Sequence, residues 1–225
     1  MLQIDQENSL QSRVEVKEAS RQTFYARHGK RALDVVVGAS LLFLTAPVIL
    51  VLATLVVLTS RCHPFYTATR VGKDGNTFRL WKLRTMVYDA DRLLAQWRET
   101  PEFQREYVKS FKLQGDRRIT RVGRILRRTS LDELPQLWNV VKGDMSLVGP
   151  RPIVQEELLQ YGPHADRLLS VRPGLTGPWQ LNGRNDIGYP ERIWVELRYC
   201  NSSTVFEDLI LVARTVLVPF RLSGH

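Results

Sequence analysis

Two adjacent carboxylates, Asp132 and Glu133, lie in a stretch that is otherwise rich in cations. The stretch runs from Arg127 to Pro152 and reads R-R-T-S-L-D-E-L-P-Q-L-W-N-V-V-K-G-D-M-S-L-V-G-P-R-P, with Arg151 held between two prolines. Carboxylates beside cations suit a site that handles phosphate groups and a divalent metal. The rest of the chain must therefore position this stretch.

The same residues also fit a purely structural role. Ser130 followed three residues later by Glu133 has the spacing of a capping box, and acidic residues favour the first turn of a helix. Alternatively, Asp132 is itself the N-cap, which would place Pro135 in the first turn, where proline is tolerated. Capping and catalysis are compatible, because a helix N-terminus stabilises a phosphate.

Two other segments offer groups that could bind phosphate. Phe78 to Thr85 has the pattern of an extended segment, in which alternation places Lys82 and Arg84 on one side. A solvated basic strand face explains this pattern equally well. Residues 171–186 contain three glycines and two prolines, which predicts an ordered loop and neither a helix nor a regular strand. The loop carries donors for phosphate, ribose or base at Arg172, Gln180, Asn182, Arg184 and Asn185.

A long apolar segment precedes these motifs. From Val35 to Thr59 no side chain is charged, and about 25 residues are enough to cross the hydrocarbon core of a bilayer. Basic residues flank both ends, which would keep both ends in the cytoplasm, and Pro47 should kink the helix. A re-entrant helix and a spanning helix both remain open from these residues alone.

Composition limits the remaining possibilities. The chain has 225 residues, two cysteines, four scattered histidines and a formal net charge of +9. Its length predicts one domain, and its cysteine and histidine spacing does not suggest a zinc site or a disulfide framework. The positive charge favours an anionic partner: nucleic acid, a phosphate-bearing substrate or an anionic membrane.

The whole pattern predicts a mixed, mainly α fold with little β structure. We expect an N-terminal arm over residues 1–29, a membrane helix over 30–61, and a small compact catalytic domain over 62–225. Further helices are expected at Tyr88–Glu99 and, after a break at Pro101, in a second segment that ends at about Leu113. Three more are expected at Ile153–Tyr161, Pro190–Cys200 and about Val205–Phe220. The helix ending near Leu113 carries an aromatic stripe flanked by cations, which suits either a membrane interface or a core contact.

The order of these motifs resembles the bacterial sugar transferases, the monotopic phosphoglycosyl transferases. The resemblance begins at about Lys30 and rests on K-R-A-L-D, R-V-G-K-D-G-N-T-F-R-L-W-K-L-R-T-M, the run from D-R-R-I-T to V-G-P-R-P, and R-P-G-L-T-G-P-W-Q-L-N-G-R-N. Its K-L-Q-G-D-R-R-I-T and G-R-N-D-I-G-Y segments are most similar to exopolysaccharide galactosyl-phosphate transferases. The sequence departs from the family pattern at Ala46, where serine commonly precedes Pro47, and at Glu196, where aspartate is more usual.

The resemblance implies a reaction in which a UDP-sugar donates its sugar phosphate to undecaprenyl phosphate and UMP is released. It implies that Asp132 is the nucleophile, that Glu133 helps to hold Mg²⁺, and that Arg127 and Arg151 belong to the phosphate-binding site. It also implies a re-entrant membrane helix, amphipathic interfacial helices and a catalytic domain on the cytoplasmic face of the bacterial inner membrane. Expected partners are inner-membrane lipid, a second copy of the chain and downstream glycosyltransferases, with no nucleic acid. Galactose is the expected sugar, glucose the alternative, and a non-catalytic membrane-anchored basic adaptor the competing function.

Overall fold

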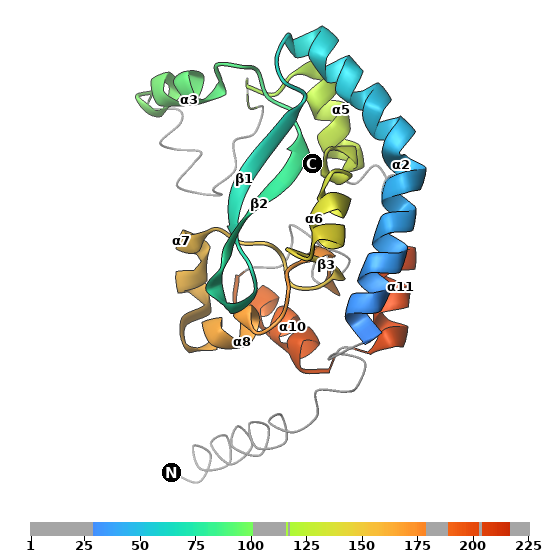
Figure 1. Cartoon of the computed structure of the whole chain (residues 1–225). Helices are drawn as coiled ribbons and strands as arrows, with labels where there is room; N and C mark the ends of the chain where they lie inside the picture. The colour runs from blue at the N-terminus through green and yellow to red at the C-terminus, as the bar shows by residue number, and fades with distance from the viewer. Residues whose placement is uncertain (1–28, 101–115, 117, 179–188, 203, 217–225) are drawn as a thin grey trace.

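A computed structural model describes residues 29–100, 116, 118–178, 189–202 and 204–216. Its largest element is helix α2, Lys30–Ser60, which runs along one side of the molecule (Figure 1). The helix contains the charge-free segment predicted from the sequence. Its length and hydropathy would allow it to cross a membrane.

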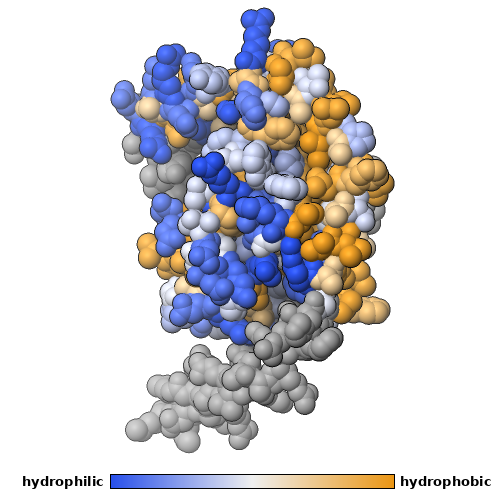
Figure 2. All heavy atoms as spheres, viewed as in Figure 1, coloured by the Kyte–Doolittle hydropathy of each residue, from blue (hydrophilic) through white to orange (hydrophobic). Residues whose placement is uncertain are grey.

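Only one narrow face of α2 is buried. Asp34, Gly38, Ala53 and Val56 are its buried residues, and they come from both ends of the helix. Large apolar side chains of the other faces are exposed at positions 35, 36, 43, 44, 48, 50, 51, 55, 57 and 58. In Figure 2 they form part of the hydrophobic surface that follows α2 along the right-hand edge. This surface would be unfavourable in water and is suited to lipid.

The helix continues through Pro47 without ending there. A proline removes one main-chain hydrogen bond, and we had expected a kink at this position. The structure shows a single helix that curves along its length (Figure 1). Close to the proline, the Thr45 hydroxyl donates to the Leu41 carbonyl at 2.7 Å. A continuous helix is compatible with both the re-entrant and the spanning arrangement. The contacts at its two ends distinguish them.

A β-hairpin follows the helix. Strands β1, Phe65–Val71, and β2, Thr77–Leu83, pair in antiparallel fashion with Tyr66 opposite Lys82. The extended segment predicted near Phe78 is thus confirmed as β2, whereas β1 was not predicted. The Asn139 side chain binds the free edge of β2: its Oδ1 accepts from Trp81 N at 3.0 Å and its Nδ2 donates to Arg79 O at 2.8 Å.

Short helices surround the hairpin. Between it and the centre of the chain lie α3, Ala90–Arg98; α5, Arg121–Thr129; the 3₁₀ turn η3, Leu131–Glu133; and α6, Gln136–Lys142. The predicted helix beginning near Tyr88 is confirmed as α3. Its expected successor, ending near Leu113, lies outside the described residues.

The C-terminal half adds further short elements. They are α7, Gln155–Leu158; η4, Leu159–His164; α8, Ala165–Leu169; α10, Tyr189–Ser202; and α11, Val205–Val216. The three helices predicted beyond Ile153 are found as α7 with η4, α10 and α11, so the first is divided into a short α-helix and a 3₁₀ segment. Helix α8 was not predicted. The fold is therefore mainly α with little β structure, as predicted.

One prediction for this half was wrong. Residues 171–186 were expected to contain no strand, but Gly174–Thr176 forms β4, which pairs in parallel with β3, Ser146–Val148. The two chains approach so closely that a Cβ on Gly174 would lie 2.1 Å from Gly149 N. The glycines thus permit a close strand pair here, whereas composition alone suggested a loop.

The main core lies where α2, α6, β2, β3 and the last two helices meet. It contains Leu80, Leu137, Val140, Met145, Leu147, Val148, Tyr199 and Leu211. A second cluster, made of Ala53, Val56, Leu83 and Leu126, packs the far end of α2 against β2 and α5. Both ends of the long helix are therefore fixed to the same folded body.

Candidate active site

A tight junction between α5 and η3 brings Arg127 and Asp132 into one region. The Thr120 side chain caps α5 by accepting from Gly123 N at 2.8 Å, and the helix ends at Ser130, whose φ is 58°. This left-handed residue reverses the chain into the 3₁₀ turn that carries Asp132 and Glu133.

Both capping predictions were wrong. Ser130 lies in the left-handed region and makes no side-chain capping bond, whereas a capping box needs an extended residue there. Asp132 is not an N-cap either, because it lies inside η3, and α6 begins only at Gln136, after Pro135. The two adjacent acids therefore do not serve to cap a helix.

The Asp132 carboxyl group is buried and close to charges of both signs. Only 7% of the residue is exposed. The pKa of Asp132 is raised from 3.8 to about 6, and burial is the largest cause. Lys82 and Arg127 act to lower this pKa, whereas the charge of Glu133 acts to raise it. A carboxylate that is poorly solvated but held close to cations is suited to nucleophilic attack on an anionic phosphorus.

Glu133 forms an ion pair with the strand beside it. Lys82 Nζ donates to Glu133 Oε1 at 2.7 Å, and each side chain is about one third exposed. The pairing depends on β2, whose edge is held by the buried Asn139. The alternation of strand residues thus turns Lys82 towards the two carboxylates, as expected for a residue on one face of β2.

Arg127 is held in place by the segment that leaves β2. Its Nε donates to Thr85 Oγ1 at 2.8 Å, while the Thr85 carbonyl accepts from Thr120 N at 3.0 Å. This contact requires a glycine at position 123, because a Cβ there would lie 2.0 Å from the Thr85 carbonyl oxygen. Close packing of α5 on Thr85 therefore fixes the position of the arginine.

Arg151 is held through its main chain by a buried glutamate. Arg151 N donates to Glu196 Oε1 at 3.1 Å, and the Tyr161 hydroxyl donates to Glu196 Oε2 at 2.5 Å. Glu196 has no exposed surface. The Arg151 side chain is exposed, and its charge contributes to lowering the pKa of the half-buried Arg70, for which burial is the largest cause. Two arginines thus lie within electrostatic range of each other beside α7.

Sequence reasoning missed Arg70, Asn139 and the structural role of Glu196. Glu196 lies on an amphipathic helix, where a glutamate is normally taken to be solvated. Its spacing of four residues from Arg192 was the only available signal, and the two side chains do approach to 3.4 Å. Nothing in the local sequence around Asn139 indicates that its amide would extend the hairpin.

Two of the predicted phosphate-binding residues are engaged elsewhere. Arg84 donates through Nε to the His63 carbonyl at 2.9 Å and lies over the Tyr66 ring, 5.9 Å from its centroid. Arg172 donates through Nε to the Gly143 carbonyl at 2.8 Å, at the C-terminus of α6. The structure therefore gives both residues roles in packing, and their contact with substrate stays a prediction. Gln180, Asn182, Arg184 and Asn185 lie outside the described residues.

The two carboxylates suit Mg²⁺ as part of a larger ligand set. Among the described residues, no three Asp, Glu, His or Cys side chains come close enough together to hold a metal alone. Mg²⁺ commonly binds through one or two protein carboxylates and takes its other ligands from substrate phosphates and water. Asp132 and Glu133, which are adjacent on one turn, fit this arrangement, and the charge of Glu133 acts to raise the pKa of Asp132.

The chain matches one family model and several known proteins. Residues 25–221 match the family model described as bacterial sugar transferase. The chain is 42% identical over 188 residues to the exopolysaccharide production protein ExoY of Rhizobium meliloti, covering 83% of each chain. It is 40% identical over 200 residues to the UDP-galactose-lipid carrier transferase of Erwinia amylovora, covering 88% of this chain and 42% of that protein. Against the undecaprenyl-phosphate galactose phosphotransferase of Salmonella typhimurium it is 42% identical over 201 residues, again covering 88% and 42%.

Proposed function

Because the chain belongs to the bacterial sugar transferase family, we propose that it transfers a sugar 1-phosphate from a UDP-sugar to undecaprenyl phosphate. The observation that carries this proposal is the buried Asp132 carboxyl group, placed beside Glu133 and within the field of Lys82 and Arg127. The chain spans about two fifths of the length of its Erwinia and Salmonella relatives. The match to the family model, residues 25–221, nevertheless spans every residue of the proposed site.

The reaction divides into two displacements at one phosphorus. An Asp132 oxygen attacks the phosphorus that bears the sugar, the bond from this phosphorus to the bridging oxygen breaks, and UMP leaves. A phosphate oxygen of undecaprenyl phosphate then attacks the same phosphorus, and the Asp132 carboxylate is released with undecaprenyl diphosphate sugar as product. No net proton transfer is required, and the covalent step divides one difficult displacement between anions into two.

The cations around Asp132 make these steps electrostatically feasible. Lys82 and Arg127 stabilise the carboxylate and would reduce its repulsion from the incoming diphosphate. Mg²⁺, held by Glu133 and Asp132 together with the substrate, would supply further neutralisation of phosphate charge. Arg151 would bind phosphate from the side of α7, where it is oriented by the Glu196 contact to its main chain.

The arrangement of α2 supports a membrane-associated enzyme with a re-entrant helix. At the first end, Lys30 Nζ is 2.5 Å from Asp208 Oδ2, and Asp34 Oδ1 accepts from Ser146 Oγ and Leu147 N at 2.9 Å. At the other end, Ala53 and Val56 pack on the same body. A helix held this way would enter and leave the bilayer on one side, which we propose is the cytoplasmic side of the bacterial inner membrane. The exposed apolar side chains of α11 would then lie in the interface.

Galactose is the sugar that we propose, and the first step of exopolysaccharide assembly is the proposed place of the reaction. The names of the Erwinia and Salmonella relatives support galactose, and the name of the Rhizobium relative supports exopolysaccharide production. Downstream glycosyltransferases would consume the product, and a second copy of the chain is a further proposed partner.

Release of UMP tests the function. Protein held in nanodiscs with Mg²⁺ and undecaprenyl phosphate should release UMP from UDP-galactose and not from UDP-glucose or UDP-N-acetylglucosamine. Release from UDP-glucose alone would change the sugar and keep the reaction class. No release from any donor by folded protein would favour a basic adaptor, which should instead bind anions with an affinity that falls steeply as salt rises.

A further inference from the structure

The side of the hairpin opposite Lys82 carries two neighbouring hollows. Residues with odd numbers share this side, because strand side chains alternate, and all the strand residues that line the hollows except Phe78 are odd-numbered. The first hollow, the apolar groove, has a volume of about 530 Å³ and lies between α2 and the start of β1. Its lining consists of Leu42, Ala46, Ile49, Leu50, Ala53, Thr54, Val57, Pro64 and Phe65. Eight of these nine residues have no polar side-chain atom, so the groove is suited to a hydrocarbon chain.

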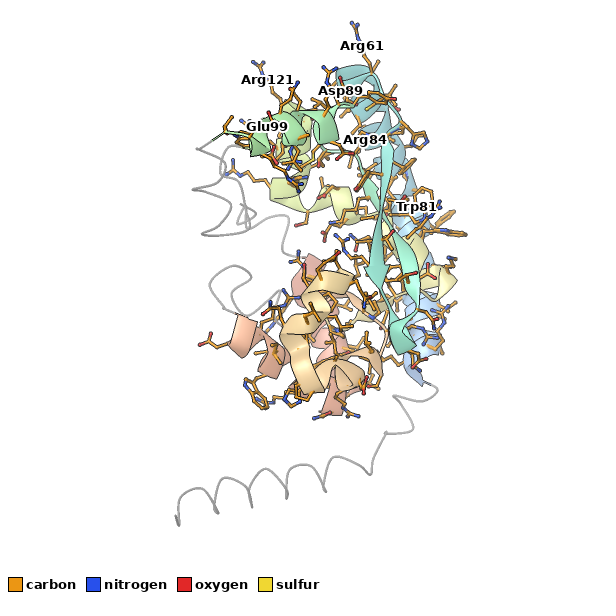
Figure 3. The ribbon with its side chains drawn as sticks, turned by 90° about the vertical axis from the view of Figure 1, so that its left-hand side faces the viewer. Arg61, Trp81, Arg84, Asp89, Glu99 and Arg121 are labelled. Atoms are coloured by element: carbon orange, nitrogen blue, oxygen red, sulfur yellow. The ribbon has the colours of Figure 1, made fainter. Side chains whose placement is uncertain are left out.

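The second hollow, the tryptophan pocket, combines aromatic rings with charges. It has a volume of about 580 Å³ and is lined by Thr69, Thr77, Phe78, Arg79, Trp81, Trp138, Lys142 and Asp144. Half of Trp138 is exposed, and Trp81 projects towards the outer edge of the molecule in Figure 3. Tryptophans with one exposed edge are typical of proteins at the boundary between hydrocarbon and headgroups.

A direct aromatic contact joins the two hollows. Phe65, which lines the apolar groove, packs edge-to-face on Trp81 of the tryptophan pocket, with ring centroids 6.2 Å apart. The surface therefore changes in order from aliphatic to aromatic to cationic. Figure 2 shows the same change from the hydrophobic edge along α2 to the more hydrophilic surface over the hairpin. This order matches the chemistry of a phospholipid from its acyl chains to its phosphate.

We propose that this surface binds an anionic phospholipid of the bilayer, with an acyl chain in the apolar groove and the phosphate between Arg79 and Lys142. Arg79 is exposed, and the Lys142 side chain is 58% exposed and 3.0 Å from Asp144. Asp144 partly neutralises the pocket, but Asn139 Nδ2 also donates to it at 3.0 Å, and a net positive charge remains. Cations near a membrane surface attract anionic lipids in this way.

The ligand differs from the acceptor of the proposed reaction. An acceptor phosphate has to reach Asp132, and the lysine associated with Asp132 is on the opposite side of β2. A phosphate between Arg79 and Lys142 is therefore not in the site of reaction. The lipid would instead fix the hairpin at headgroup depth. This proposal depends on α2 lying in the bilayer but not on the identity of the reaction.

Selective quenching of tryptophan fluorescence tests the proposal. The protein is placed in nanodiscs of phosphatidylcholine with a minor fraction of phosphatidylglycerol. Two preparations are compared, in which either the phosphatidylcholine or the phosphatidylglycerol carries bromine near the headgroup, and the mole fraction of brominated lipid is the same in both. Brominated phosphatidylglycerol should quench more strongly. The Arg79→Gln/Lys142→Gln variant should lose this preference, by a factor on the order of fivefold for each cation. A Trp81→Phe/Trp138→Phe variant should lose the selective part of the quenching.

A matched control removes two exposed cations that do not line either hollow. Arg92→Gln/Arg121→Gln has the same change in net charge and should keep the preference for phosphatidylglycerol. Equal quenching by the two brominated lipids in the unaltered protein would overturn the proposal. An equal loss in the control variant would also overturn it, because the effect would then reflect overall charge. Thermal unfolding of each variant establishes that it is folded, and UMP release is not needed as a readout.

Discussion

The Asp132 carboxyl group shows how one residue can lower stability for the sake of function. Its burial disfavours the ionised form, while the proposed nucleophile must be ionised. Bound phosphates and a divalent cation would change this balance only when substrate is present. The ionised carboxylate therefore lowers the unfolding free energy of the substrate-free protein, as is common for catalytic groups.

Replacing Asp132 with asparagine should stabilise the free protein while abolishing UMP release. The pKa of Asp132 is raised to about 6, so above pH 6 the folded state carries a penalty that is absent from the unfolded chain. The folded state takes up a proton first as the pH falls, and the penalty disappears between pH 6 and pH 4. At pH 7.5 Asp132→Asn should gain up to about 3 kcal/mol in unfolding free energy, and the gain should vanish near pH 4.

Thermal unfolding at several pH values, with Asp166→Asn as a control at an exposed acid, measures this effect. An Asp132→Asn protein that is less stable than the unaltered protein at pH 7.5 would contradict the assigned environment.

The same titration predicts that the rate of UMP release has an acidic limb, since it should fall as the pH drops through about 6.

At the scale of elements, the site is built by close contacts that the sequence shows only indirectly. The long helix, β2, α3 and the late helices could be predicted, because periodicity and charge-free length are local signals. The β3–β4 pair could not, because glycine-rich composition does not indicate which backbones approach each other. The β1 strand was also not predicted, although its aromatic and β-branched residues are typical of a strand. The local pattern around Ser130 suggested the start of a helix, but the residue ends α5 in the left-handed conformation.

Gly123 gives the clearest test of this packing. Gly123→Ala should cost about 1–3 kcal/mol in unfolding free energy, because its Cβ would overlap the Thr85 carbonyl oxygen, 2.0 Å away. The displaced Thr85 would also move the partner of Arg127, so UMP release should fall more than stability alone explains. Gly38→Ala is the control, since its Cβ would meet side-chain atoms of Val140 and Val141, of which the nearest is a Val140 methyl group at 3.1 Å. Equal effects of the two substitutions on unfolding would contradict the role of the α5–Thr85 contact.

At the scale of the whole molecule, the position of α2 determines how the proposed site would meet a lipid substrate. The helix is held by ion pairs and hydrogen bonds at its start and by apolar contacts near its end, all on one body. In a spanning arrangement one of these sets of contacts would have to be broken. The re-entrant arrangement preserves both and places the catalytic stretch beside the membrane surface.

Thiol labelling tests this topology with few changes to the chain. Cys62 lies just beyond the end of α2 and is half-buried, while burial raises the pKa of Cys200 to about 12 and makes that thiol unreactive. In inverted membrane vesicles, an impermeant maleimide should label Cys62 in the unaltered protein. It should also label Gly29→Cys in a Cys62→Ser background. Labelling of the two positions from opposite faces would establish a spanning helix.

Detection of a sugar phosphate on Asp132 is the most direct test of the central claim. The protein is incubated with UDP-galactose and Mg²⁺ in the absence of undecaprenyl phosphate, quenched and digested with a protease. Mass spectrometry should then find one hexose phosphate on the peptide that contains Asp132, released by hydroxylamine and absent from Asp132→Asn. Addition of undecaprenyl phosphate should discharge it. An enzyme that turns over fully but never carries this adduct, or carries it on another residue, would contradict the account.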